Sequence, residues 1–253
     1  ADSDGSVTVS GVDSAWTNTD YLAIGYHGSG ALSIADGGTV LNDRVDIGAN
    51  AGSSGAATVD GAAANWINSG YLYVGLSGSG TLDVTNGGAV SSLGAFLGGQ
   101  TDSDGTVTVS GADSTWTNTN DLRVGQGGSG VLTITNGGTV SNVNASIRSG
   151  SDFNSSAVVD GAGSAWTSSG GLVVGQNNNS TLAITNGGAV SCTTGYISQG
   201  LNSSSSVTVS GAGSTWTNSV SLTVGKAGDG ALGIAGGGGV LVLVPEIALT
   251  PQL

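Results

Sequence analysis

The chain has 253 residues, 48 of them Gly; only 8% of its residues are charged, with a formal net charge of −13 at pH 7 and four basic side chains. Gly, Ser, Thr, Asn and Asp weaken helices, so the composition excludes a mainly helical protein, and the 38% of hydrophobic residues excludes a solvated disordered chain. The acidic balance excludes nucleic acids and anionic membrane surfaces as partners, because both would be repelled.

Short stretches of alternating residues begin the chain. Residues 7–9 (VTV), 22–24 (LAI) and 32–34 (LSI) each place an apolar residue on either side of an outward one, the pattern of a short strand with one buried face. Residues 7–9 match 32–34 at a shift of 25, and residues 22–24 match 45–47 at a shift of 23. Each fifty residues therefore divide into two coils, and each coil has three short strands.

The same fifty residues recur five times without an insertion, as the column Val9, Val59, Val109, Val159 and Val209 shows. Turn chemistry recurs as well, since Asp36-Gly37-Gly38 becomes Asn-Gly-Gly in the next three units and supplies the positive φ of tight corners. Turns that recur at the same position of every second coil indicate a chain that winds in one direction, as in a solenoid, rather than one that reverses in hairpins. We therefore predict an all-β fold over residues 1–240, a single parallel β-helix (β-solenoid) of about ten coils stacked ~4.8 Å apart.

Residues 241–253 depart from the repeat. From Val240 to the end the chain reads VLVLVPEIALTPQL in place of the turn expected after Gly239, and Pro245 and Pro251 end regular pairing because proline has no backbone N–H. We expect a non-repeat C-terminal cap or tail that covers or leaves the final coil. The chain begins without Met, a basic leader or a long apolar run, so we expect no signal peptide and no membrane-inserted span in it, and read it as a segment of something longer.

One tryptophan recurs in every unit, opposite an apolar residue of the Val40 series in the other coil; these residues are Trp16, Trp66, Trp116, Trp166 and Trp216. Thr lies on either side of Trp116, so the threonines share the face opposite the indole. A column in which Trp alternates with Val predicts that the indoles are buried and pack in a structural core. A row of surface platforms for a ligand is the alternative.

Residues that resemble catalytic or metal-binding motifs stand alone. His27 is the only histidine, in a turn whose counterpart has no titratable group, and Cys192 has no ligand cluster around it. The acidic turn DSDG, at residues 2–5 and 102–105, lacks the remaining ligands of a calcium loop. We predict no catalytic residue, no metal site and no cofactor.

The aromatic residues other than Trp lie at outward positions of the third strand. On successive coils we expect one side of the rod to carry Tyr21, Tyr71, Tyr73 and Phe96, followed by Arg123. Exposed aromatic rows are typical of faces that bind glycans or proteins. The alternative is that these residues are good strand formers that stack between neighbouring coils.

The motifs SGAxSTWTN, LxVG and GSGxLxITNGGxVS resemble the repeat of the secreted passenger domains of bacterial autotransporters, the type V secretion adhesins, over residues 5–240. The resemblance implies a right-handed β-helix that is exported across the outer membrane and lies on the bacterial cell surface or is secreted. It also implies adhesion or self-association, as in aggregation and biofilm formation, with host-cell or bacterial surface glycans or proteins as partners. We therefore expect a non-enzymatic rod that presents an adhesive face.

Two other functions remain open. One is a glycan-binding or polysaccharide-cleaving β-helix. Cleavage would need two carboxylates on neighbouring coils, whereas Asp60 and Asp160 share one outward phase but lie four coils apart, roughly 19 Å. An ice-binding solenoid would need unbroken ranks of paired Thr. Those ranks are interrupted by Asp60, Asp83, Val158, Ala183 and Gly233.

Overall fold

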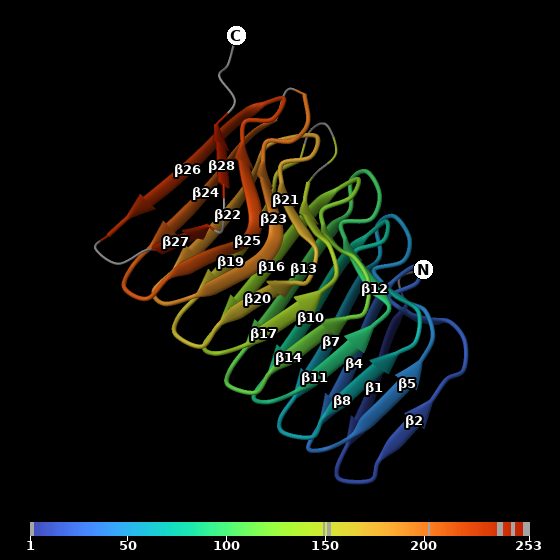
Figure 1. Ribbon diagram of the computed structural model, residues 1–253. Helices are drawn as coiled ribbons and strands as arrows, with labels where there is room; N and C mark the ends of the chain where they lie inside the picture. Colours follow the sequence, from blue (N-terminus) through green and yellow to red (C-terminus); the bar gives the residue numbers. More distant parts are fainter. Residues whose placement is uncertain are drawn as a thin grey trace.

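A computed structural model describes residues 3–148, 150, 153–201, 203–236, 240–243 and 246–249, the backbone alone for 242, 243 and 246–249. In this part of the chain every regular element is a strand, and every strand pairing is parallel. The strands wind into a right-handed parallel β-solenoid of about nine turns, which confirms the predicted fold class. Figure 1 shows the turns stacked as a rod from the N-terminal to the C-terminal end.

One wall of the rod is a sheet of ten strands, most of them seven residues long, with one strand from each coil. In stacking order they are β1 (Asp4–Ser10), β4 (Ser29–Ala35), β7 (Ser54–Asp60), β10 (Ser79–Thr85), β13 (Asp104–Ser110), β16 (Ser129–Thr135), β19 (Ser155–Asp160), β22 (Ser180–Thr185), β24 (Ser204–Ser210) and β26 (Asp229–Ala235). We call this wall the long-strand sheet.

A second sheet closes the coils with two shorter strands from each. The second-strand row contains β2 (Ala15–Thr17), β5 (Thr39–Asn42), β8 (Asn65–Asn68), β11 (Ala89–Ser92), β14 (Thr115–Asn118), β17 (Thr139–Asn142) and β20 (Ala165–Ser168). The third-strand row contains β3 (Leu22–Ile24), β6 (Val45–Ile47), β9 (Tyr71–Val74), β12 (Gly94–Leu97), β15 (Leu122–Val124), β18 (Ala145–Ile147) and β21 (Gly171–Val174). Near the C-terminal end β23 (Ala189–Ile197) and β25 (Thr215–Val224) run through both rows.

The pairing register agrees with the shifts read from the sequence. Val7 pairs with Leu32 in the long-strand sheet, a shift of 25, and Leu22 pairs with Val45 in the third-strand row, a shift of 23. Between them Trp16 pairs with Val40. The strands of neighbouring coils therefore stay in register, and the difference between the two shifts lies in the length of the turns.

The recurring Asn-Gly turns have the backbone conformation that the sequence predicts. Asn86 and Gly87 have φ angles of 52° and 89°, in the left-handed region that Asn and Gly tolerate best. Gly75, which follows β9, has a φ of 70°, and a Cβ added there would clash with the backbone carbonyl of Asp104 in the coil above. The Asn-Gly corners are therefore restricted by backbone conformation, and Gly75 is restricted by both conformation and lack of space.

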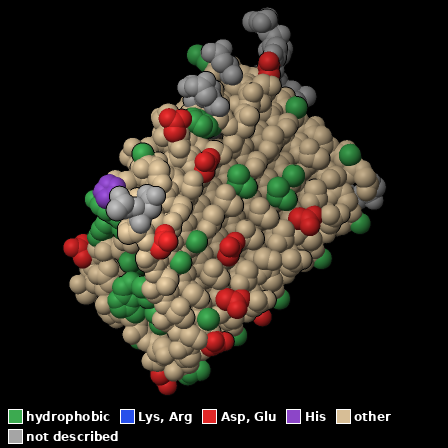
Figure 2. Space-filling view, turned by 180° about the vertical axis from the view of Figure 1, so that it is seen from behind, with side chains coloured by type: hydrophobic (Ala, Val, Ile, Leu, Met, Phe, Trp, Pro, Cys, Tyr) green, Lys and Arg blue, Asp and Glu red, His purple; other side chains and the backbone are tan. Residues whose placement is uncertain are grey.

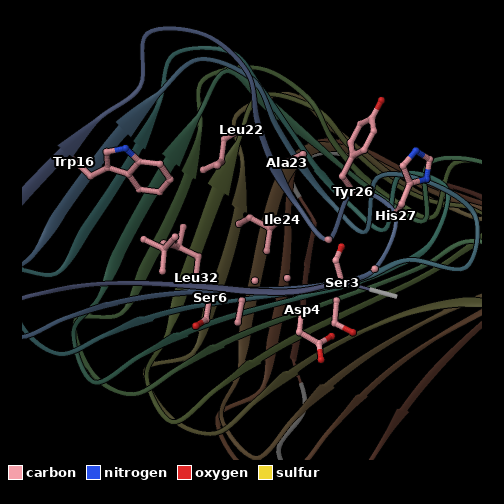
Figure 3. Close-up of a pocket in the computed structure, with 17 residues that line it drawn as sticks. Ser3, Asp4, Ser6, Trp16, Leu22, Ala23, Ile24, Tyr26, His27 and Leu32 are labelled. Carbon is pink, nitrogen blue, oxygen red and sulfur yellow. The ribbon is translucent and has the colours of Figure 1, made fainter. Parts of the chain in front are cut away.

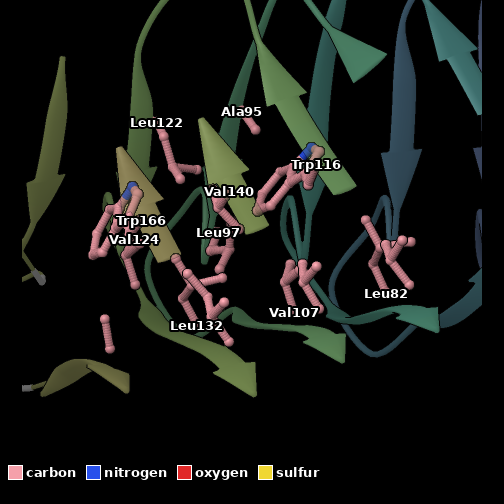
Figure 4. Packing of buried hydrophobic residues seen from close by; sticks show 14 of the residues in the cluster. Leu82, Ala95, Leu97, Val107, Trp116, Leu122, Val124, Leu132, Val140 and Trp166 are labelled. Carbon is pink, nitrogen blue, oxygen red and sulfur yellow. The ribbon is translucent and has the colours of Figure 1, made fainter. Parts of the chain in front are cut away.

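The tryptophans fill the interior. Trp66, Trp116, Trp166 and Trp216 are at most 1% exposed, whereas Trp16 in the first coil is only partly buried. Val140 pairs with Trp116 on one side and with Trp166 on the other, so aromatic and aliphatic layers alternate along the axis (Figure 4). This is the arrangement expected of core residues.

A row of polar side chains also runs inside the rod, beside the tryptophans. This inner polar row consists of Asn42, Asn68, Ser92, Asn118, Asn142, Ser168, Cys192 and Asn218. Asn42 Oδ1 accepts a hydrogen bond of 2.7 Å from Trp66 Nε1, and Asn142 Oδ1 accepts one of 2.8 Å from Trp166 Nε1. The Nε1 atoms of Trp116 and Trp216 are buried and have no partner among the described residues. In those two cases the preceding coil carries Ser92 or Cys192 in place of Asn.

The segment expected to form a cap or tail pairs with the last coil where it is described. β27 (Val240–Leu243) and β28 (Glu246–Leu249) both lie parallel to β25, so each row of the second sheet gains one strand. Pro245 and Pro251, where pairing was expected to end, lie outside the described residues.

Candidate functional site

The third-strand row carries one outward column along the whole rod, in the order Ala23, Asp46, Tyr73, Phe96, Arg123, Ser146, Val173, Tyr196 and Thr223. Within each strand the flanking residues point inward, as Leu72 and Val74 do beside Tyr73. The alternation of a half-buried strand therefore places side chains from successive coils directly above one another.

Four of the five residues predicted for the binding face are in contact. The rings of Tyr73 and Phe96 stack with centroids 4.9 Å apart and planes 15° apart, and Tyr71 lies 5.5 Å from Phe96 at 47°. The guanidinium of Arg123 lies over Phe96, with Cζ 5.2 Å from the ring centroid. Stacking between coils, which was the alternative interpretation, is thus present, and it leaves Tyr71 36% exposed.

The fifth residue, Tyr21, is linked to the others through Arg44. Cζ of Arg44 lies 5.8 Å from the Tyr21 ring centroid and 4.7 Å from the Tyr73 ring centroid. A guanidinium within about 6 Å of an aromatic face is attracted by the ring quadrupole. We call this contiguous set, Tyr21, Arg44, Tyr71, Tyr73, Phe96 and Arg123, the aromatic row.

An ion pair anchors one end of the aromatic row. Arg44 Nε and NH2 donate to Asp46 Oδ1 and Oδ2, both at 2.9 Å, in a bidentate pair. Asp46 is only 2% exposed although it lies on the outer column. Burial and the nearby Asp46 carboxylate raise the pKa of Tyr21 to about 12, so the phenol stays neutral.

The sequence reasoning missed Arg44 and Asp46, although a signal was present. The shift of 23 that aligns residues 22–24 with 45–47 places Arg44 level with Tyr21 on the next coil, and Leu22 N donates to Arg44 O. It also places Asp46 level with Ala23 on the outward column.

Positive charge is confined to this side of the rod. All four basic residues lie in the third-strand row or within two residues of one of its strands, namely Arg44, Arg123, Arg148 and Lys226. Viewed from behind, the described residues show scattered acidic side chains and no visible Lys or Arg (Figure 2). The four basic side chains of an acidic molecule therefore share one side of the rod, and two of them, Arg44 and Arg123, belong to the aromatic row.

A cavity of about 380 Å³ opens at the N-terminal end of the rod. Figure 3 shows Trp16, Leu22 and Leu32 lining it from inside, with Tyr26 and His27 at one corner. The rings of Tyr26 and His27 meet edge to face at 4.6 Å, and His27 is exposed. This cavity is the open end of the hydrophobic core.

The isolated carboxylates hold turns in place. Thr85 and Asn86 donate hydrogen bonds of 2.6 and 2.7 Å to Asp60, which lowers the pKa of that carboxyl group. Asp160 accepts the same two bonds from the equivalent residues one hundred positions later. Across the described ranges no three His, Cys, Asp or Glu side chains gather as metal ligands.

The described residues include no helix that is long and apolar enough to cross a membrane. Comparison of the chain with family models, with curated proteins and with solved structures finds no match.

Proposed function

We propose that this protein is a non-enzymatic rod that presents the aromatic row as an adhesive face for glycans. The observation that supports this most directly is the contact chain from Tyr71 through Phe96 to Arg123, which brings aromatic edges, a phenol hydroxyl and a guanidinium together on one outer surface. Tyr and Arg are the residues on which binding energy concentrates at protein interfaces. Amphipathic rings suit a sugar, which has both apolar C–H faces and hydroxyl groups.

The face is held in one conformation before any ligand arrives. Stacking between Tyr73 and Phe96, and the cover of Arg44 over Tyr73, restrict the rotamers of these side chains. A ligand therefore loses little free energy to ordering the protein, which favours binding by a modest surface.

The repeat motifs that resemble autotransporter passenger domains support a location for this activity. We propose that the rod is displayed on a bacterial surface or secreted, where it would mediate adhesion to host or bacterial glycans and contribute to aggregation or biofilm. A rod of stacked coils suits display, since its length separates the binding face from whatever anchors it.

The test replaces Tyr71, Tyr73 and Phe96 together by Ser and measures binding on a glycan array and in a cell-aggregation assay. All three are at least partly exposed, so the variant should retain the solenoid, as circular dichroism and the fluorescence of the buried tryptophans would verify. We expect the triple variant to lose binding to every glycan on the array that the unmodified protein binds.

A matched control changes three outward residues of the long-strand sheet, on coils three to five. Thr58, Asp83 and Thr108 pair in register there, and their replacement by Ser should leave binding unchanged. Unchanged binding in the Tyr71, Tyr73 and Phe96 variant would reject the proposed face.

A further inference from the structure

Beyond Phe96 the aromatic row leads into a pocket of about 200 Å³ on coils five to seven. Its polar lining comes from neighbouring strands and turns: Arg123 from β15, Ser146 and Arg148 from β18 and the position after it, and Gln176 from the turn after β21. Asp121, just before β15, and Asn144, just before β18, complete the polar rim, so one carboxylate of the protein also lines the pocket. Donor groups from three successive coils thus converge on one concavity.

The described residues compensate the two guanidinium groups of this pocket poorly. Arg123 NH2 lies 3.7 Å from Asp121 Oδ2, too far for a strong hydrogen bond, and Asp121 also accepts from Asn144 Nδ2 at 3.1 Å. Arg148 is only partly exposed, and among the described residues it forms no ion pair. Its NH1 donates to Gln176 Oε1 at 3.2 Å, while its Nε is buried without a partner.

Arg44 shows what a compensated arginine looks like in this chain, because its Nε and Nη2 both donate to one carboxylate. A buried donor without an acceptor is costly, and two guanidinium groups that share a pocket repel each other. Burial and the neighbouring Arg123 both lower the pKa of Arg148, so the protein itself disfavours the second charge. An anion in the pocket would remove both penalties.

We propose that this pocket binds the carboxylate of an acidic sugar, within a glycan chain whose neighbouring rings lie along the aromatic row. Arg123 belongs to both surfaces, since its guanidinium covers Phe96 and also lines the pocket. The ligand class is a polysaccharide that contains hexuronate residues. This inference rests on the proposed function and names the substrate class of the same face.

The charge of the whole molecule favours a glycan with at most one negative charge per sugar ring over a chain with several sulfate groups per ring. The net charge is −13, and acidic side chains are scattered over the face seen in Figure 2, so the molecule as a whole would repel a heavily sulfated chain. A carboxylate offers two oxygens to the planar fork of an arginine and brings one negative charge.

The test compares oligogalacturonate with the same oligomer in its methyl-esterified form, in which each carboxylate has lost its charge and gained a methyl group. Isothermal titration calorimetry on the whole chain should show tighter binding of the acidic form by ~10-fold or more, the size expected for a charge-assisted hydrogen bond. The preference should weaken as salt is added.

Three variants test which residues cause the preference for the acidic oligomer. Arg148→Gln should abolish the preference for the acid, and Arg148→Lys, which keeps the charge but loses the fork, should retain only part of it. Asp121→Asn should strengthen binding of the acid, because it removes the carboxylate that competes for Arg123 and keeps an oxygen for Asn144. Lys226→Gln is the control, since it changes the net charge equally and does not line the pocket.

The outcomes separate the two proposals. Equal binding of the two oligomers, or a preference for the acid that persists in Arg148→Gln, would overturn the carboxylate site and leave the adhesive face standing. Preference for dextran sulfate over oligogalacturonate would identify the anion as a sulfate ester and also overturn this assignment. Loss of all glycan binding in Arg148→Gln alone, with the aromatic variant unaffected, would overturn the proposed function instead.

Discussion

Replacement of Ser92 by Asn should stabilise the protein. Four tryptophans occupy equivalent, fully buried positions, and they fall into two pairs according to one residue in the preceding coil. Where that residue is Asn42 or Asn142, the indole N–H is hydrogen-bonded; where it is Ser92 or Cys192, the indole N–H has no partner among the described residues. The native protein thus contains buried tryptophans of both kinds, with Asn in the preceding coil and without it.

The size of the effect follows from the geometry of the Asn42 pair. Asn42 accepts from Trp66 Nε1 at 2.7 Å and donates through Nδ2 to Asn68 Oδ1 at 2.7 Å. Ser92 already donates to Asn118 Oδ1 at 2.6 Å, so an Asn at this position would keep that bond and add the one to Trp116. An unsatisfied buried donor costs roughly 1–3 kcal/mol, and we therefore expect about 1–2 kcal/mol of added stability after the larger side chain is accommodated.

Urea unfolding followed by circular dichroism would measure this gain, and the denaturant midpoint should rise with an unchanged slope. Among the five indole N–H resonances, those of Trp66 and Trp166 should be hydrogen-bonded signals and that of Trp116 a free one, and the Trp116 signal should move to the bonded group in the variant. Ser91→Asn, on the outward face of the same strand, is the control and should change stability by less than ~0.5 kcal/mol. A destabilised Ser92→Asn protein, or a Trp116 signal that stays in place, would contradict this reasoning.

Three further predictions concern backbone strain and titration. Gly233→Ala adds a Cβ in open space and should change the free energy of unfolding by less than ~1 kcal/mol; Gly52→Ala, at a φ of 78°, should cost ~1–2 kcal/mol, and Gly75→Ala should cost more than either because it also clashes with backbone. Equal midpoints for the three in denaturant would refute this order. Cys192 is buried with a pKa raised to about 11, so it should resist thiol reagents at neutral pH until the chain unfolds, and rapid labelling of the native protein would contradict its burial. The pKa of Tyr21 is about 12 in the folded state and near 10 when unfolded, so the neutral phenol favours the folded state, and stability should fall as pH rises from about 10 to about 12. Phenolate absorbance should show one late-titrating group that is lost in Tyr21→Phe.

The fold was predictable because the repeat carries its own register. A fifty-residue period without insertions fixes which residues lie above one another, and the alternation around Val9 or Leu22 fixes which side chains point inward. The pairing of Trp16 with Val40 followed from the same alignment. Once the register is known, the core follows from periodicity alone.

The candidate site was predictable only in part, because the residues that the sequence did not predict have long side chains or lie in turns. Tyr73 and Phe96 are on strands, so their phase sets their direction, and the contact between them followed from the register. Arg148 and Gln176 lie just after their strands, where alternation no longer dictates where a side chain points. Asp46 has an outward phase and is nevertheless buried, because Arg44 binds its carboxylate from the adjacent turn.

The alternation of Trp with Val in the core has a consequence for how such a molecule can change in length. Removal of a single coil would place two indoles in adjacent layers ~4.8 Å apart, where Val140 now separates Trp116 from Trp166. Loss or duplication of a complete fifty-residue unit leaves every layer with its present neighbours. Rods built on this pattern should therefore lengthen or shorten in steps of two coils, about 9.6 Å each, and recombination within the repeats can vary the reach of the molecule without disturbing its interior.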